Sequence, residues 1–211
     1  MGIRQHVRNH FRKKYNICAR QMLTNLDATV FSSNCVGGVI SHDLGLRFNS
    51  PTVNLFMYPA DYLRFLGNLP YYLSLKPKQI DVDSPYPVGM LDDVRVDFVH
   101  YGCFLEASSA WERRCERVDL TNCCAIMVDR DGCTYDQAVA FSNLPFECKA
   151  FLTAAPLDLS CVVSNPDWLE PNGQQTRDLC AFKNCLSTSR WIDDFDVVDF
   201  LNSAGGIIDC Q

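Results

Sequence analysis

Two aspartates, Asp129 and Asp131, follow the apolar run in the stretch AIMVDRDGCT and stand two residues apart. Carboxylates at this spacing can hold a divalent cation such as Mg²⁺ or Mn²⁺, which in turn can bind a diphosphate. The same stretch comes close to a phosphatase signature in which the first aspartate is the nucleophile, but Cys133 stands where that signature needs threonine. A purely structural Asp-Gly turn at Gly132 is the alternative. The sequence indicates no other cofactor.

The stretch SSNCVGGVISHDLG offers a second group of reactive and ligand-binding residue types, namely Asn34, Cys35, Gly37, Gly38 and His42. Adjacent glycines let the backbone approach a ligand closely, and free N–H groups at the start of a helix can bind phosphate. Cys35 is a nucleophile only if its surroundings activate the thiol, and His42 is a candidate partner. We favour Asn34 and the two glycines as binding elements.

A histidine and several arginines complete the candidate residues. His100 follows another apolar run and can serve as a general base or a phosphate contact. Arg114 and Arg130 can offset the charge of a diphosphate. Arg113 and Arg117 stand four apart on one predicted helix, which suits recognition of a diphosphate or carboxylate; pairing with acidic neighbours on a solvated face is the alternative.

Short apolar runs alternate with segments of helical periodicity along the chain. The pattern predicts strands over 27–33, 50–56, 79–83, 94–101, 123–129 and 148–154, and helices over 3–26, 58–73, 103–118, 134–145 and 191–206. We expect at most one helical turn over 39–45 and a loop over 84–93. The alternation predicts an α/β fold in three layers, with a largely parallel sheet between flanking helices. Ligands of such sheets bind at the carboxyl ends of the strands, so the polar strand ends should meet.

The N-terminal segment differs in charge from the rest of the chain. Residues 1–26 contain six arginines and lysines and no acid, whereas the whole chain has a formal net charge of -6. We expect a basic amphipathic helix that either packs on the domain or lies on an anionic membrane surface. The remaining residues, 27–211, should form a single α/β domain with an irregular part over 155–190. The charge distribution does not favour nucleic acid as a partner.

Composition places the protein among globular chains, with 47% hydrophobic and 21% charged residues in 211. No apolar stretch is long enough to cross a membrane, and no apolar segment of a signal peptide follows the basic N-terminus. The twelve cysteines lack metal-binding spacing, so we expect free thiols and a cytoplasmic protein, peripheral at the inner membrane face if the N-terminal helix docks there.

Several stretches, in order along the chain, resemble an uncharacterised bacterial family that is often labelled exopolysaccharide biosynthesis protein. These stretches are SSNCVGG, DLGLRFNSPTVNLF, YPADYLRFLGNL, YPVGMLDDVRVDFVHY, AWERRCERV and VDRDGCT. The resemblance covers roughly residues 23–203. It implies an α/β protein of capsule or exopolysaccharide assembly and supplies no catalytic residues. Its motif positions correspond here to Asn34, Cys35, Gly37, Gly38, Ser50, Pro51, Thr52, His100, Tyr101, Trp111, Arg114, Asp129, Arg130, Asp131 and Gly132.

Three functional hypotheses follow. The first is a glycosyltransferase-like transferase of exopolysaccharide biosynthesis that binds a nucleotide sugar or another phosphorylated ligand, with His100, Asp129 and Asp131 in catalysis and the two aspartates as metal ligands. Its ligand-binding residues would be Asn34, Cys35, Gly37, Gly38, His42, Thr52, Tyr101, Trp111, Arg114, Arg130 and Gly132. The second is a hydrolase, or an acyl or phosphoryl transferase, with Cys35 or Asp129 as nucleophile. The third is a module without catalysis that docks enzymes at the membrane through residues 1–26.

Overall fold

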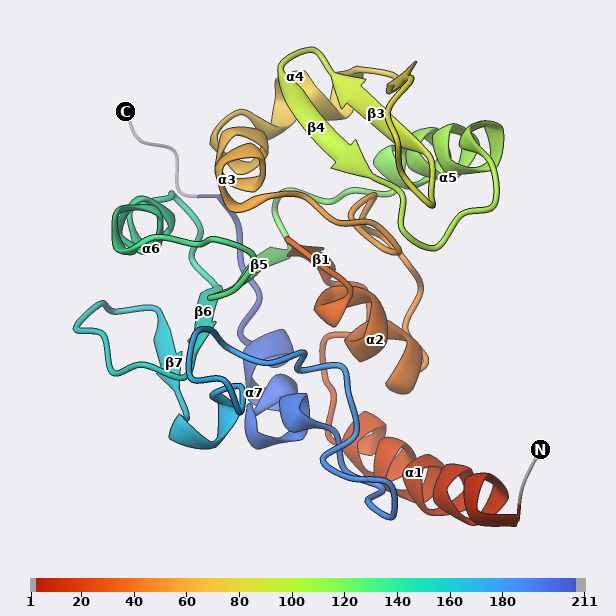
Figure 1. Cartoon of the computed structure of the whole chain (residues 1–211), viewed down its shortest axis with the longest axis vertical. Helices are drawn as coiled ribbons and strands as arrows, with labels where there is room; N and C mark the ends of the chain where they lie inside the picture. The colour runs from red at the N-terminus through yellow and green to blue at the C-terminus, as the bar shows by residue number, and fades with distance from the viewer. Residues whose placement is uncertain (1–2, 208–211) are drawn as a thin grey trace.

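A four-stranded parallel sheet forms the centre of the protein, seen in a computed structural model that describes residues 3–207 (Figure 1). The strand order is β1 (Thr29–Ser32), β5 (Cys123–Val128), β6 (Lys149–Thr153) and β7 (Val162–Ser164). Every neighbouring pair in this sheet is parallel. The α/β class and a parallel sheet are therefore confirmed, and β7 adds a strand within the stretch predicted to be irregular.

A second, smaller sheet lies apart from the first, at the opposite end of the view from α1 in Figure 1. It is antiparallel and contains β2 (Lys78–Ile80), β3 (Val88–Leu91) and β4 (Val94–Asp97). The prediction of a loop over 84–93 is wrong because β3 forms there. Only Asp92 and Asp93 separate β3 from β4, and Asp92 has a φ of 56°. So short a connection joins only antiparallel strands. β4 pairs with β3 and is not among the strands of the parallel sheet.

Seven α-helices and two short 3₁₀ helices accompany the strands in residues 3–207. The α-helices are α1 (Ile3–Gln21), α2 (Val36–Asp43), α3 (Pro59–Gly67), α4 (Leu69–Ser74), α5 (Phe104–Cys115), α6 (Tyr135–Ser142) and α7 (Val197–Asn202), and the 3₁₀ helices are η1 (Pro166–Trp168) and η2 (Trp191–Asp194). α2 is longer than the single turn predicted. The predicted helix over 58–73 breaks at Asn68, just before Pro70, and the predicted closing helix divides into η2 and α7.

The predicted strand over 50–56 is also wrong. Turns occupy most of this segment, and only Phe56 makes an isolated bridge, with Asp97 of β4. Asn54 has a φ of 66°, which interrupts an extended backbone. The segment is nevertheless buried, since Val53 and Leu55 lie in the interior.

The apolar core lies on both faces of the parallel sheet. Alternate residues of β5 belong to different clusters: Cys123, Ala125 and Met127 on one side, and Cys124, Ile126 and Val128 on the other. Helices α3, α5 and α6 contribute to the first cluster, and α1, α2 and α7 to the second. A strand buried on both faces explains the continuous apolar run of β5. A regular three-layer arrangement and the amphipathic character of the N-terminal helix stay predictions.

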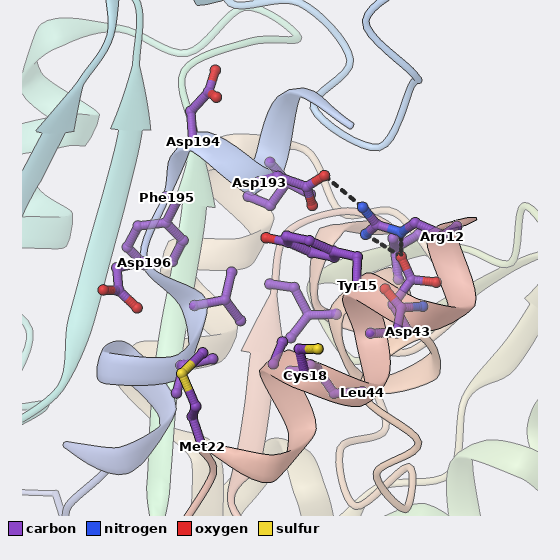
Figure 2. A pocket seen from close by; sticks show the side chains of 17 residues that line it. Arg12, Tyr15, Cys18, Met22, Asp43, Leu44, Asp193, Asp194, Phe195 and Asp196 are labelled. Atoms are coloured by element: carbon purple, nitrogen blue, oxygen red, sulfur yellow. Dashed lines mark hydrogen bonds and ion pairs between the residues drawn. The ribbon is translucent and has the colours of Figure 1, made fainter. Parts of the chain in front are cut away.

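Buried ion pairs tie α1 to the rest of the protein (Figure 2). Arg12 is only 8% exposed, and its guanidinium lies 2.5 Å from Asp43 at the end of α2 and 2.5 Å from Asp193 in η2. Arg190 Nε donates to the same oxygen of Asp43, at 3.1 Å. The charge of Arg12 is thus paired with buried carboxylates of the same chain. Within residues 3–207, no helix has the length and apolar character required to span a membrane.

Candidate active site

A cysteine and a histidine from different strand ends meet in the structure. Cys35 Sγ lies 3.1 Å from Nε2 of His100. Cys35 stands between β1 and α2 and is partly buried, while His100 follows β4 and is exposed. A thiol and an imidazole at this distance can exchange a proton. The pair therefore has the composition and spacing of a nucleophile and its base.

Asn34 shapes the turn from β1 into α2. Its Oδ1 accepts a hydrogen bond of 3.1 Å from the backbone N–H of Val36, the first residue of the helix. The next two N–H groups, those of Gly37 and Gly38, have no acceptor among residues 3–207. N–H groups at the start of a helix carry partial positive charge and can stabilise an anion. They belong to the same helix end as Cys35, the N-cap residue of α2.

Gly37 also has a packing role, which Gly38 does not share. A Cβ at Gly37 would lie 2.8 Å from Cβ of Ser32, so the start of α2 packs directly on β1. A Cβ at Gly38 would lie 3.4 Å from Cγ1 of Val53, which is an ordinary contact. Close packing at Gly37 holds the start of α2, and with it Cys35, at the carboxyl end of β1.

Asp178 and Cys180 interact electrostatically with Cys35, although nothing in the sequence pattern indicates them. Burial raises the pKa of the Cys35 thiol, and the negative charge of Asp178 raises it further. Burial likewise raises the pKa of Cys180, with smaller contributions from Asp178 and Cys35. Both residues belong to the stretch without periodicity over 155–190, so only the folded chain reveals their position. The raised pKa means that the Cys35 thiol is protonated at neutral pH and needs a base to react.

The two aspartates after β5 each have partners within the protein. Asp129 Oδ2 accepts a hydrogen bond of 2.7 Å from Oγ1 of Thr153, at the end of β6. Asp131 Oδ2 accepts one of 3.1 Å from Nε of Arg130. Asp131 has a φ of 59° and Gly132 a φ of 83°, so the backbone turns sharply between β5 and α6. In the part of the chain that the structure describes, no three His, Cys, Asp or Glu side chains are grouped to hold a metal ion. Metal binding by the aspartates stays a prediction.

The loop after β7 connects the ends of β5 and β1. The N–H of Thr176 donates to the backbone oxygen of Asp129, at 3.0 Å, and Thr176 Oγ1 accepts from the N–H of Ala154 after β6. Asp178, two residues further on, is the residue whose charge acts on Cys35. Of the polar strand ends predicted to meet, the structure brings Cys35 and His100 into contact, although β4, the strand before His100, belongs to the small antiparallel sheet and not to the parallel one.

Other predicted binding residues have structural contacts. Thr52 is buried, and its Oγ1 accepts from the N–H of Ser32 at 3.0 Å. Trp111 is buried, and its Nε1 donates to the backbone oxygen of Leu75 at 3.1 Å. The exposed His42 lies at the opposite end of α2 from Cys35, so it is not the partner of the thiol.

Arg114 and Tyr101 contact each other close to the histidine. Nη1 of the buried Arg114 donates to the Tyr101 hydroxyl at 2.6 Å and to the backbone oxygen of Val53 at 2.8 Å. This arginine therefore fixes Tyr101, the residue next to His100, against the segment before α3. We infer that it positions the histidine.

A cavity lies apart from the cysteine–histidine pair (Figure 2). It has a volume of about 370 Å³ and is lined by α1, α2 and the segment from η2 into α7. Neither Cys35 nor His100 lines it. The cysteine–histidine pair is accessible instead through the exposed His100 at the surface.

Comparisons with known proteins give a family and a relative. A profile of the family described as a domain of unknown function (DUF1919) matches residues 6–202. A protein of Haemophilus influenzae, described as an uncharacterized protein, is 36% identical over 189 residues, which cover 90% of this chain and 91% of that protein. Neither description states an activity.

Proposed function

The chain belongs to the family described as a domain of unknown function (DUF1919), and we propose that it is a hydrolase or acyltransferase with Cys35 as nucleophile and His100 as base. The predicted resemblance to an uncharacterised family is thereby confirmed, while its link to exopolysaccharide biosynthesis stays a prediction. The 3.1 Å contact between Cys35 Sγ and His100 Nε2 carries the proposal. It favours the second of the three functional hypotheses.

The proposed reaction begins when the sulfur of Cys35 attacks the carbonyl carbon of an ester, thioester or amide. The thiol proton passes to Nε2 of His100, a carbon–sulfur bond forms, and the bond to the leaving group breaks as that group takes the proton from the histidine. Water or an acceptor hydroxyl or amine then attacks the thioester, with His100 again as base, and the thiol is regenerated. The N–H groups of Gly37 and Gly38, which have no acceptor among residues 3–207, would stabilise the oxyanion that forms in each step.

The raised pKa of the Cys35 thiol means that a base must remove its proton. Burial and the charge of Asp178 raise this pKa, so a stable thiolate does not form at neutral pH. Proton transfer to His100 at the moment of attack avoids the need for one. The proposal therefore requires the histidine as a base, not only as a neighbour.

The rate of Cys35 alkylation by iodoacetamide, read by mass spectrometry, tests this role. The substitution His100→Gln removes the base and should slow alkylation of Cys35 by about tenfold or more, because general bases contribute at least that much. The exposed Cys185 in the same chain is the internal control and should react at an unchanged rate. Equal rates of Cys35 alkylation in both proteins would contradict the proposal.

A nucleotide-sugar transferase is the second candidate. It is supported by the position of Asp129 at the carboxyl end of a central parallel strand, where ligands of such sheets bind. Titration with nucleotide sugars and Mn²⁺, followed by thermal shift, tests it. A transferase should be stabilised by a donor in a manner that Asp129→Ala abolishes; no stabilisation by any donor, or an unchanged response in the variant, counts against it.

Docking of α1 to an anionic membrane surface is a separate proposal about location. It is supported by α1, where Phe11 and Ile17 are 53% and 48% exposed and Lys13 and Lys14 are exposed as well, and by Met22 just after the helix, which is 60% exposed. Apolar side chains next to lysines favour the interface of an acidic bilayer. Co-sedimentation with anionic vesicles should be lost in the double variant Phe11→Ser and Met22→Ser. Unchanged binding, or none by the unaltered protein, would contradict it.

A further inference from the structure

Three arginines from separate parts of the chain line one hollow at the surface. Arg47 lies between α2 and α3, Arg113 in the last turn of α5, and Arg117 just beyond that helix. The hollow has a volume of about 540 Å³. Its other lining residues are Asp27, Asn49, Glu116 and Asp119.

This hollow lies away from the cysteine–histidine pair. Asp27 and Asp119 precede β1 and β5, so the hollow is at the amino ends of these parallel strands. Cys35 and Asp129 follow the same two strands at the opposite edge. A ligand in the hollow is therefore a separate matter from the proposed thiol chemistry, and the inference does not depend on that chemistry.

The arginines of the hollow have no carboxylate partner in the described part of the chain. Among residues 3–207, no ion pair within 4.0 Å involves Arg47, Arg113 or Arg117, although three acidic residues line the same hollow. Arg117 Nη1 donates to the backbone oxygen of Phe48, at 3.3 Å. Desolvation lowers the pKa of Arg117, and the charges of Arg47, Arg113 and Arg114 lower it further, while Glu116 offsets this only in part. Repulsion among these guanidinium groups would be relieved by a bound anion.

The residue types indicate which anion fits. A guanidinium group presents a planar fork of N–H donors that matches the oxygens of a phosphate. The carboxylates of Asp27 and Glu116 and the amide of Asn49 can accept hydrogen bonds from hydroxyl groups. We propose that this hollow binds a small phosphate ester that also carries hydroxyl groups, with the phosphate held by Arg47, Arg113 and Arg117.

Isothermal titration calorimetry at low salt tests the site with three probes: glycerol 3-phosphate, inorganic phosphate and glycerol. Glycerol 3-phosphate should bind more tightly than inorganic phosphate, and glycerol should not bind. The substitutions Arg113→Gln and Arg117→Gln should each weaken binding by about tenfold or more, as loss of a charge-assisted hydrogen bond implies. Arg64→Gln is the matched control, because Arg64 is an exposed arginine paired with Asp61 elsewhere on the surface, and its affinity should be unchanged.

Each variant should first be shown to keep the thermal midpoint of the unaltered protein, so that a loss of binding reflects the site. Arg113 is exposed and makes no ion pair in the described part of the chain, so Arg113→Gln should fold normally. Absence of binding by both phosphate probes would overturn the proposal. Binding that Arg113→Gln and Arg117→Gln leave unchanged would also overturn it, since the phosphate would then lie elsewhere.

Discussion

The substitution Gly37→Ala should destabilise the protein, whereas Gly38→Ala, one residue further along α2, should not. A Cβ at Gly37 would lie 2.8 Å from Cβ of Ser32 and 3.3 Å from Cγ1 of Val30, both in β1. Side chains do not approach so closely, so α2 or β1 would have to shift. At Gly38 the nearest atom is Cγ1 of Val53, at 3.4 Å, which leaves room for a methyl group.

The comparison isolates the contact with β1. Both substitutions add one methyl group in the first turn of the same helix, so the gain from replacing glycine by alanine, about 1 kcal/mol at most, is common to both. Overpacking of a filled site costs about 1–3 kcal/mol. We therefore expect the free energy of unfolding of G37A to be lower than that of G38A by about 1–3 kcal/mol.

Equilibrium unfolding in urea measures this difference for both variants under the same conditions. G37A should also slow the alkylation of Cys35, because a displaced α2 moves the thiol away from His100. If G37A proves as stable as G38A, or more stable, the explanation of Gly37 by close packing is refuted.

Three further results are expected. Asp178→Asn removes a negative charge that raises the pKa of Cys35, so Cys35 should be alkylated faster at pH 7.5 than in the unaltered protein. A slower or equal rate would show that this charge does not act on the thiol. Arg12→Met leaves the buried carboxylates of Asp43 and Asp193 without their shared partner. The free energy of unfolding, measured in urea, should fall by about 3 kcal/mol, and a loss under about 1 kcal/mol would argue against a buried network. Burial raises the pKa of Asp43, but hydrogen bonds and charge from Arg12 outweigh this effect, so the net pKa is lowered. The stability that Asp43 contributes is therefore present above about pH 4 and is lost as the pH falls through the folded pKa. D43N should lose stability less steeply in acid, and an equally steep loss would contradict this.

The elements of the parallel sheet are largely predictable from the sequence. β5 is a run of six buried residues in CCAIMV, and a strand covered on both faces needs such a run. The helix of Trp111 and the capped helix that begins after Thr134 also follow from periodicity and from side-chain capping. These features are local, so a window of the sequence contains the information that determines them.

The small sheet is less predictable because its decisive signal is a two-residue turn. Asp92 in the left-handed region lets β3 and β4 pair directly, and β4 lies in the small sheet with β3. The alternation of β4 fits either sheet. The pairing with β3 determines to which sheet β4 belongs, and the composition of residues 84–93 predicts a loop and not a strand.

The cysteine–histidine pair was only partly predictable. Cys35 and His100 are each recognisable as chemically capable residues after apolar runs, but 65 positions separate them. The nearer His42 is the more obvious partner by spacing, and α2 separates it from Cys35 by its full length. The effect of Asp178 on the Cys35 thiol could not be predicted, because Asp178 lies in a segment without periodicity, 143 positions further along the chain, and its position depends on the folded structure.

Acylation of the protein by small activated esters tests the central claim most directly. Under single-turnover conditions with p-nitrophenyl acetate and related esters, we expect a burst of p-nitrophenolate of about one equivalent per chain, as a covalent acyl-enzyme requires. Mass spectrometry should locate the acyl group on Cys35, Cys35→Ser should abolish the burst, and His100→Gln should slow it. An acyl group on another residue, or a burst that Cys35→Ser leaves intact, would contradict the assignment of Cys35 as the nucleophile.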